Sequence, residues 1–179
     1  MTFEVIVLAA GKGTRMQSRE PKVMQDLAGR SLFSHVMTTA AGLQPSHIHV
    51  VHGHDDGVLQ RAVQQLSGVN WVCQDQQLGT AHAVLQALPA VNPKSDVLVL
   101  YGDVPLIKQP TLASLVAAVA GRNLVVLTAH VPEPGGYGRV VRGRDGSVAH
   151  IVEERDANED EKAICEINTG FIAAPATVL

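Results

Sequence analysis

The stretch from Val5 to Met16 reads VIVLAAGKGTRM and joins an apolar run to a glycine-rich turn. The apolar residues 5–8 are typical of a buried strand in a parallel sheet. Gly11 and Gly13 follow where that strand should end, and α/β sheets bind ligands at the carboxyl ends of their strands. Backbone N–H groups of such a turn can approach an anion because glycine has no side chain to shield them. The stretch therefore predicts an α/β fold with a phosphate-binding turn.

The alternation of strand and helix patterns continues along the chain. Short β-rich runs occur at residues 47–51, 70–73 and 97–101. Apolar residues recur at helical spacing between them, within residues 32–41, 58–66, 81–88 and 112–119. This order is typical of repeated βαβ units and predicts a Rossmann-like, mostly parallel sheet.

The pattern changes after residue 121. One more strand is expected at residues 124–131, and the runs at 138–141 and 148–152 flank a glycine-containing turn. Two such runs predict an added antiparallel β-ribbon. The charged residues 155–162 are expected to be solvated, and a further strand is expected from residue 170.

Composition and charge limit the class of function. Of the 179 residues, 46% are hydrophobic, which is enough for the core of one α/β domain. The 14 Lys and Arg nearly balance the 17 Asp and Glu, and no cluster of like charge is long enough to coat nucleic acid or an anionic membrane. No run reaches the roughly 18 uncharged apolar residues of a membrane span. We therefore expect a cytoplasmic protein with neither a nucleic acid nor a membrane as partner.

The cysteines and histidines suggest no metal centre. Cys73 and Cys165 match no metal or redox spacing, and we expect both to be small buried apolar residues. Four histidines alternate along the second predicted strand and its exit, but no nearby cysteine or second histidine pair completes a metal shell. We expect them to be exposed or hydrogen-bonded.

Two familiar phosphate-binding motifs do not fit the glycine turn. A Walker A loop needs a glycine six positions before its lysine, and Ile6 stands there relative to Lys12. A dinucleotide fingerprint needs a third glycine where Met16 stands. Arg15 and Lys22 instead place two cations beyond the turn, which favours a triphosphate as the ligand.

The turn and the residues PKVM at 21–24 together resemble the signature of sugar-phosphate nucleotidyltransferases. Further motifs follow in order: Gln74 with QLGTAHA at 77–83, YGDVPL at 101–106, GYGR at 136–139, IVEE at 151–154 and EINTG at 166–170. Through these motifs the chain resembles the bacterial N-acetylglucosamine-1-phosphate uridylyltransferases. In bifunctional members this is the N-terminal domain, and a glucosamine-1-phosphate N-acetyltransferase follows it.

The resemblance implies a glycosyltransferase-A-like nucleotidyltransferase fold and a reaction. UTP and N-acetylglucosamine 1-phosphate would give UDP-N-acetylglucosamine and pyrophosphate with Mg²⁺ as cofactor, for peptidoglycan and lipopolysaccharide precursors of the cell wall. Residues 1–179 would form the uridylyltransferase domain without its C-terminal part. The left-handed β-helix acetyltransferase domain would be absent, and a homo-oligomer, a trimer, is expected only where that domain is present.

The resemblance also assigns site residues. The catalytic residues would be Arg15, Lys22 and Asp103, and Asp103 would be the metal ligand, because a carboxylate is the hard oxygen ligand that Mg²⁺ prefers. The nucleotide would be bound by Leu8, Ala9, Ala10, Gly11, Gln74, Gly79, Thr80, Tyr101 and Gly102. The sugar would be bound by Gly138, Glu153 and Asn168.

Several alternatives stay open. Thr80 could instead act as the N-cap of the helix expected from Ala81. Lys12 could face phosphate or solvent, and His82 could serve only to orient that helix. Met24 and Gln25 depart from the leucine and histidine common in the family. The chain could also be another sugar-1-phosphate or molybdenum-cofactor nucleotidyltransferase, or an inactive nucleotide-sugar-binding fragment.

Overall fold

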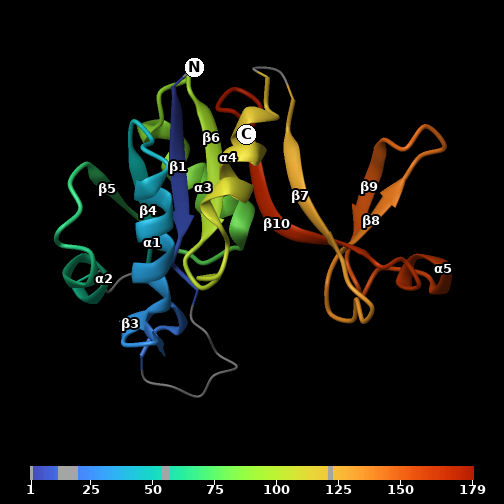
Figure 1. Ribbon diagram of the computed structural model, residues 1–179, viewed down its shortest axis with the longest axis horizontal. Coiled ribbons are helices and arrows are strands. Elements are labelled where there is room, and N and C mark those ends of the chain that lie inside the picture. The colour runs from blue at the N-terminus through green and yellow to red at the C-terminus, as the bar shows by residue number, and fades with distance from the viewer. Residues whose placement is uncertain (1, 12–19, 54–56, 121–122) are drawn as a thin grey trace. The chain divides into compact units, whose positions relative to one another are not determined.

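The computed structural model describes residues 2–11, 20–53, 57–120 and 123–179 (Figure 1). The chain divides into two compact units. The first consists of Met1–Val125 and Ala173–Leu179, and the second of Val126–Ile172. The second unit is therefore inserted into the sequence of the first.

A parallel sheet forms the centre of the first unit. Its strand order is β5-β4-β1-β6, and the end of β10 continues the sheet beside β6. β1 pairs in parallel with β4 on one side and with β6 on the other, so that Val5 lies opposite both Ile48 and Leu98. The bounds are β1 Phe3–Leu8, β4 Ile48–His52, β5 Val69–Cys73, β6 Asp96–Tyr101 and β10 Glu166–Pro175. The predicted Rossmann-like parallel sheet is confirmed.

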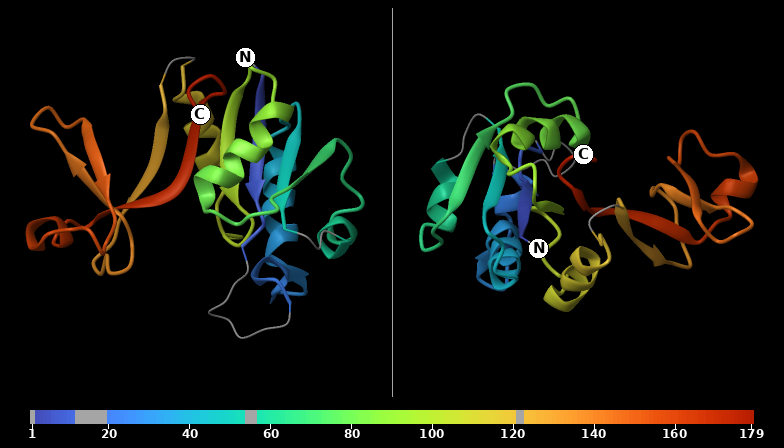
Figure 2. Two further views of the ribbon diagram at one scale, coloured as in Figure 1. Left: turned by 180° about the vertical axis from the view of Figure 1, so that it is seen from behind. Right: turned by 90° about the horizontal axis from the view of Figure 1, so that it is seen from above.

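Helices cover both faces of this sheet. Figure 2 shows α1 and α4 on one face and α3 on the other. α1 is Leu32–Gly42, α3 is Thr80–Ala87 and α4 is Gln109–Ala117, close to the predicted ranges. α2 is only Gly57–Ala62, because the following residues form tight turns that still bury Val63. Among the helices of the described chain, none combines the length and the apolar character that a bilayer crossing requires.

Short elements join the main ones. A 3₁₀ helix, η2 (Lys22–Met24), leads into a small antiparallel hairpin, β2 (Asp26–Leu27) with β3 (Arg30–Ser31). The Ser31 side chain then caps α1 by accepting a hydrogen bond from the Ser34 amide at 3.1 Å. A second 3₁₀ helix, η3 (Leu88–Ala90), follows α3.

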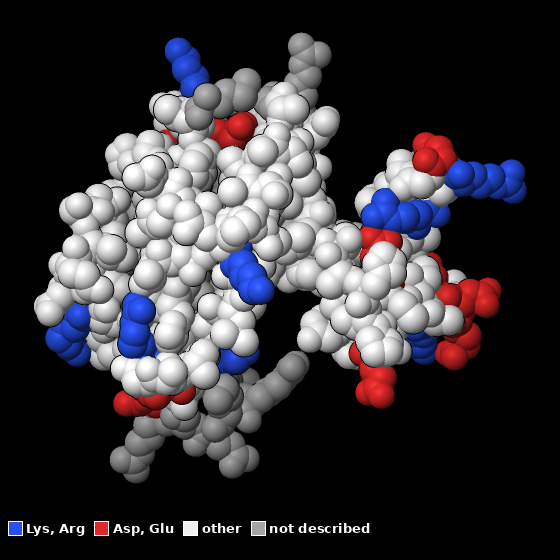
Figure 3. All heavy atoms as spheres, in the orientation of Figure 1, with Lys and Arg blue, Asp and Glu red and all other residues white. Residues whose placement is uncertain are grey.

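The second unit contains the predicted antiparallel ribbon. β8 (Arg139–Arg142) pairs antiparallel with β9 (Val148–Val152) and with β10, and β7 (Val125–His130) also pairs with β10. The charged stretch contains a short helix that was not predicted, α5 (Glu159–Lys162), whose start is fixed by reciprocal hydrogen bonds between Asn158 and Glu161. Figure 3 shows acidic and basic side chains gathered on this unit.

The prediction for the cysteines was wrong. Cys73 and Cys165 are both exposed and in the thiol form. Cys73 ends β5, which is the edge strand of the first sheet, and Cys165 lies in the turn before β10. Strand edges and turns leave side chains open to solvent, whereas the central strands bury theirs.

A buried polar network joins the amino-terminal ends of the central strands. Glu4 is 1% exposed and His49 is fully buried, and Nε2 of His49 donates to Oε2 of Glu4 at 2.7 Å. The Ser95 hydroxyl and the Asn92 amide donate to Oε1 of Glu4 at 3.0 and 3.2 Å. Burial raises the pKa of the Glu4 carboxyl, but these hydrogen bonds outweigh that effect and hold the pKa below its ordinary value. The network therefore requires an ionised Glu4.

We predict that Glu4→Gln lowers the free energy of unfolding by about 2 kcal/mol near neutral pH, measured by urea denaturation. Because the folded-state pKa of Glu4 lies below 4.5, the stabilisation by its charge is complete above that pH. It is lost as the pH falls through the lowered pKa, so the difference between variant and wild type should shrink in acid. Glu133→Gln, at an exposed position, is the control and should change little. A difference that persists undiminished in acid would contradict the prediction.

Candidate active site

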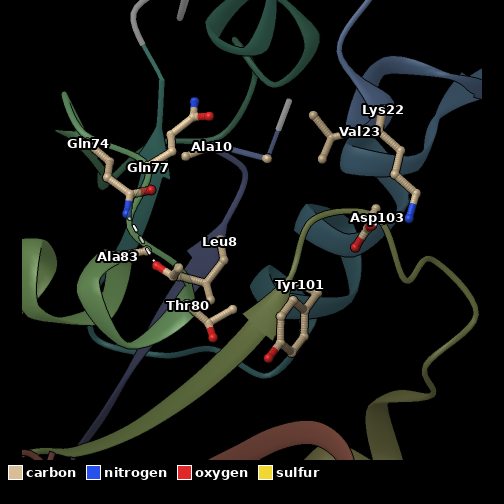
Figure 4. Close-up of a pocket in the computed structure, with 12 residues that line it drawn as sticks. Leu8, Ala10, Lys22, Val23, Gln74, Gln77, Thr80, Ala83, Tyr101 and Asp103 are labelled. Carbon is tan, nitrogen blue, oxygen red and sulfur yellow. Dashed lines mark hydrogen bonds and ion pairs between the residues drawn. The ribbon is translucent and has the colours of Figure 1, made fainter. Parts of the chain in front are cut away.

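A cavity of about 350 Å³ opens at the carboxyl ends of the parallel strands of the first unit (Figure 4). Leu8 is the last residue of β1, Tyr101 is the last residue of β6, and Gln74 directly follows β5. The cavity is lined by Leu8, Ala10, Gly11, Lys22, Val23, Gln74, Gln77, Gly79, Thr80, Ala83, Tyr101 and Asp103. This is the position at which parallel sheets of α/β proteins bind ligands.

Most of the residues expected to bind the nucleotide line this cavity. Ala9 and Gly102 do not, because both are buried in the wall behind it, where the Ala9 amide donates to Val51 and the Gly102 amide to Leu8. Arg15 and Lys12 lie outside the described residues. Val23, Gln77 and Ala83 were not predicted as lining residues, although all three belong to the motifs of the family resemblance.

Lys22 and Asp103 form an ion pair on one wall of the cavity. Nζ of Lys22 lies 2.7 Å from Oδ2 of Asp103, and the side chains are 45% and 24% exposed. Lys22 begins η2, while Asp103 lies two residues beyond β6, so the sheet and the short helix together bring the two groups into contact. A pair this exposed contributes little to folding stability, and its members can separate at small cost when a ligand enters.

Gln74 and Gln77 lie on the opposite wall from Lys22 and Asp103 (Figure 4). Gln74 is 3% exposed, and its Nε2 donates to Nδ1 of His82 at 2.9 Å and to the carbonyl of Gly79 at 3.3 Å. Its Oε1 accepts no hydrogen bond from the described residues. Oε1 of Gln74 is therefore available to accept a hydrogen bond from a ligand, and the bonds of Nε2 to His82 and to the Gly79 carbonyl fix the orientation of the amide.

The N-cap of α3 is Gly79, and the alternative that Thr80 caps the helix was wrong. Gly79 has φ 106° and ψ −179°, a conformation that residues with a side chain rarely adopt. The chain needs this turn to pass from the Gln74 segment into the helix. Thr80 is the first helical residue, and it lines the cavity together with Ala83, one turn further on.

The second unit brings together the three residues expected to bind the sugar. The Asn168 amide donates to the carbonyl of Gly138 at 2.8 Å. A Cβ atom at Gly138 would lie 3.3 Å from Oε1 of Glu153, so the absence of a side chain lets this carboxylate approach the backbone. Oδ1 of Asn168 accepts from the Gly170 amide at 3.0 Å, which leaves the side-chain NH₂ as the available donor.

Comparisons with known proteins show what the chain is similar to. Residues 5–164 match the MobA-like NTP transferase domain. The chain is 51% identical over 177 residues to the bifunctional protein GlmU of Aromatoleum aromaticum, covering 99% of this chain and 39% of that protein. It is 48% identical over 179 residues to the same-named protein of Xanthomonas oryzae pv. oryzae, covering 100% and 39%. The chain thus spans about two fifths of the length of these curated relatives.

A solved structure supports the fold. The crystal structure of UDP-glucose pyrophosphorylase complexed with UDP-glucose superposes with a TM-score of 0.78, covering 99% of this chain and 78% of that chain. The sequences are only 16% identical, so this similarity concerns the fold alone. It confirms the expected nucleotidyltransferase-like sheet.

The wall of the cavity depends on glycine at position 102. A Cβ atom there would lie 3.2 Å from the carbonyl oxygen of Leu8 and 3.3 Å from Cγ1 of Val23. We predict that Gly102→Ala lowers the free energy of unfolding by about 1–2 kcal/mol, because the ends of β1 and β6 must move apart. Gly11→Ala is the matched control, since no described atom lies within 4 Å of its new Cβ. Equal stability of the two variants in urea titrations would refute this packing argument.

Proposed function

The chain belongs to the family of MobA-like NTP transferase domains, and from this premise we propose that it transfers a uridylyl group from UTP to N-acetylglucosamine 1-phosphate. The observation that carries the proposal is the cavity, with the Lys22–Asp103 pair on one wall and the oriented Gln74 amide on the other. The motifs shared with the uridylyltransferases support the choice of substrates, as does an identity of about one half to the longer relatives. In this proposal the chain corresponds to the nucleotidyl-transferring part of those relatives.

The proposed reaction is a direct in-line displacement. A phosphate oxygen of the sugar phosphate attacks the α-phosphorus of UTP, the bond between the α-phosphorus and the bridging oxygen breaks, and pyrophosphate leaves with the electron pair. No enzyme nucleophile takes part, so the protein must position two anions and meet the charge that develops on the leaving group. The backbone of Ala10 and Gly11 and the ammonium of Lys22 supply that function in the cavity. Arg15 would add a second cation.

Gln74 would select the base. The bonds of its Nε2 to His82 and Gly79 leave Oε1 as an acceptor, which matches the N3–H donor of uracil. Cytosine carries an acceptor at the same ring position, so two lone pairs would face each other and one buried acceptor would stay unpaired. The cavity therefore favours UTP over CTP.

The donors at Asp103 fit a magnesium ion. The carboxylate oxygens of Asp103 are hard ligands at the cavity. The described residues contain no group of three or more His, Cys, Asp or Glu that could hold a metal without the substrate. Mg²⁺ commonly binds through one or two carboxylates together with substrate phosphates and water. When bound, the ion would neutralise triphosphate charge. Asp103 would hold it and would then release Lys22 toward the phosphates.

The second unit would bind the acceptor sugar. Glu153 would accept hydrogen bonds from ring hydroxyls, and the NH₂ of Asn168 would donate to a hydroxyl or to the acetamido oxygen. Gly138 would offer its backbone amide. We propose that the product serves cell-wall precursor synthesis in the cytoplasm.

The substrates can be tested by measuring pyrophosphate release with each nucleoside triphosphate and each sugar 1-phosphate. We expect UTP with N-acetylglucosamine 1-phosphate and Mg²⁺ to give the highest kcat/KM. Asp103→Asn and Lys22→Met should each lower kcat by about 100-fold or more while the circular dichroism spectrum is kept. Lys108→Met, at an exposed lysine outside the cavity, is the control and should stay near wild type. Preference for another substrate pair, or no turnover at all, would reject the proposal.

The orientation of Gln74 can be tested through His82. In His82→Phe, Nε2 of Gln74 loses the shorter of its two hydrogen bonds and keeps only the one to the Gly79 carbonyl at 3.3 Å, so the amide can rotate more readily and present a donor instead. We expect KM for UTP to rise by about three- to tenfold, the UTP over CTP preference to fall, and kcat to change little. His47→Phe, at an exposed histidine, serves as the control. An unchanged ratio of kcat/KM for the two nucleotides would show that His82 does not act through Gln74.

A further inference from the structure

Arg139 is a buried cation in the second unit. It is the first residue of β8, is 2% exposed, and heads the largest fully buried side chains of the described chain. In the sheet it lies opposite Val152 on one side and Ile167 on the other. The backbone of Arg139 therefore lies between two neighbouring strands, β9 and β10.

The guanidinium ties two chain segments together. Nη1 of Arg139 donates to the carbonyl of Tyr137, and Nη2 donates to Oε2 of Glu154 at 2.6 Å. The same carboxylate oxygen accepts from the Gly136 amide at 3.2 Å. The hydrogen bond from Arg139 is the main cause that holds the pKa of Glu154 below its ordinary value, and the bond from Gly136 is the second. The carboxyl therefore stays ionised and keeps both hydrogen bonds.

Each residue proposed to bind the sugar is next to one of these contacts. Gly138 directly precedes Arg139, Glu153 lies between Val152 and Glu154, and Asn168 follows Ile167. The three residues also contact each other, through the Asn168 to Gly138 hydrogen bond and the close approach of Glu153 to Gly138. A shift of the guanidinium would therefore act on Gly138 and Glu153 through their neighbours Tyr137 and Glu154, and on Asn168 through its hydrogen bond to Gly138.

The stability of the fold does not by itself explain an arginine at position 139. Its Nε is buried and has no hydrogen-bond acceptor among the described residues, and leaving a buried donor unpaired costs folding free energy. Arg142, three residues further along β8, shows the contrast: its Nε and Nη2 both bond the Glu166 carboxylate, at 2.7 and 2.6 Å, and its side chain is 43% exposed. A buried ion pair is weak evidence for stabilisation, so another role accounts better for Arg139.

We propose that Arg139 is a positioning residue, which holds Gly138, Glu153 and Asn168 in the arrangement that binds the acceptor sugar. The inference rests on the proposed function, because it concerns the sugar site of that reaction. The proposed role distinguishes binding of the sugar phosphate, which depends on Arg139, from binding of the nucleotide, which does not. Arg139 acts on the sugar phosphate through its neighbours, whereas the described residues that line the nucleotide cavity all belong to the first unit.

The test compares Arg139→Met, Arg139→Lys and Glu154→Gln with the matched control Arg142→Met, which breaks the neighbouring Arg–Glu pair of the same strand. We expect Arg139→Met to raise KM for N-acetylglucosamine 1-phosphate about tenfold or more, with KM for UTP within about twofold of wild type. Arg139→Lys, which keeps the charge but lacks the planar fork, should recover part of this loss. Glu154→Gln should resemble Arg139→Met, and Arg142→Met should leave both KM values near wild type.

A second measurement does not need turnover. Hydrogen exchange in peptides covering residues 136–138 and 167–169 should speed up in Arg139→Met and not in Arg142→Met, because only the first loses the ties to Tyr137 and Glu154. Equal rises of both KM values, a fall in kcat alone, or equal exchange in the two Met variants would overturn the inference. Absence of turnover in the wild-type chain would count against the proposed function, and the exchange comparison would still decide the role of Arg139.

Discussion

The parallel pairing of β1 with β4 and β6 is the constraint on which the candidate site depends. Val5, Ile6 and Val7 are fully buried, so this strand can neither shift nor tilt without exposing the core. At the amino ends the Glu4–His49 network ties the strands together, and at the carboxyl ends Leu8 and Tyr101 form the floor of the cavity. The position of the site thus follows from the register of three strands, while its chemistry comes from the loops beyond them.

Much of this arrangement could be predicted from the sequence. Local patterns decide the strands and most of the helices, because apolar spacing and turn residues act over a few neighbours. Gly11 and Asp103 each follow a strand of one parallel sheet, which is why they were expected at one edge and why both line the same cavity. The grouping of Gly138, Glu153 and Asn168 came from the family motifs alone, and the structure adds the contacts between them.

The features that escaped prediction depend on partners far away in the sequence. Nothing near Glu4 indicates that it is buried, because its donors come from residues 49, 92 and 95. β10 begins earlier than expected since Glu166 and Thr169, polar residues that weaken a strand pattern, find partners in Arg142 and Leu127. The exposure of Cys73 follows from the edge position of β5, which strand patterns alone do not reveal. The spacing of Asn158 and Glu161 is that of a capping box and could have predicted the start of α5. The many charged residues of this stretch instead led to the expectation of a solvated segment.

The path of β10 has a consequence for the order in which the chain can fold. Its last part supplies Ala173 and Ala174, both fully buried, to the sheet beside β6, but these residues are synthesised only after the whole inserted unit. In a growing chain, β6 therefore stays an open edge of the sheet until residue 173 is available. Contacts between segments this far apart close long loops and form slowly. The first unit is expected to gain its full cooperativity late in synthesis, whereas β8 and β9 can pair as soon as their own hairpin is complete.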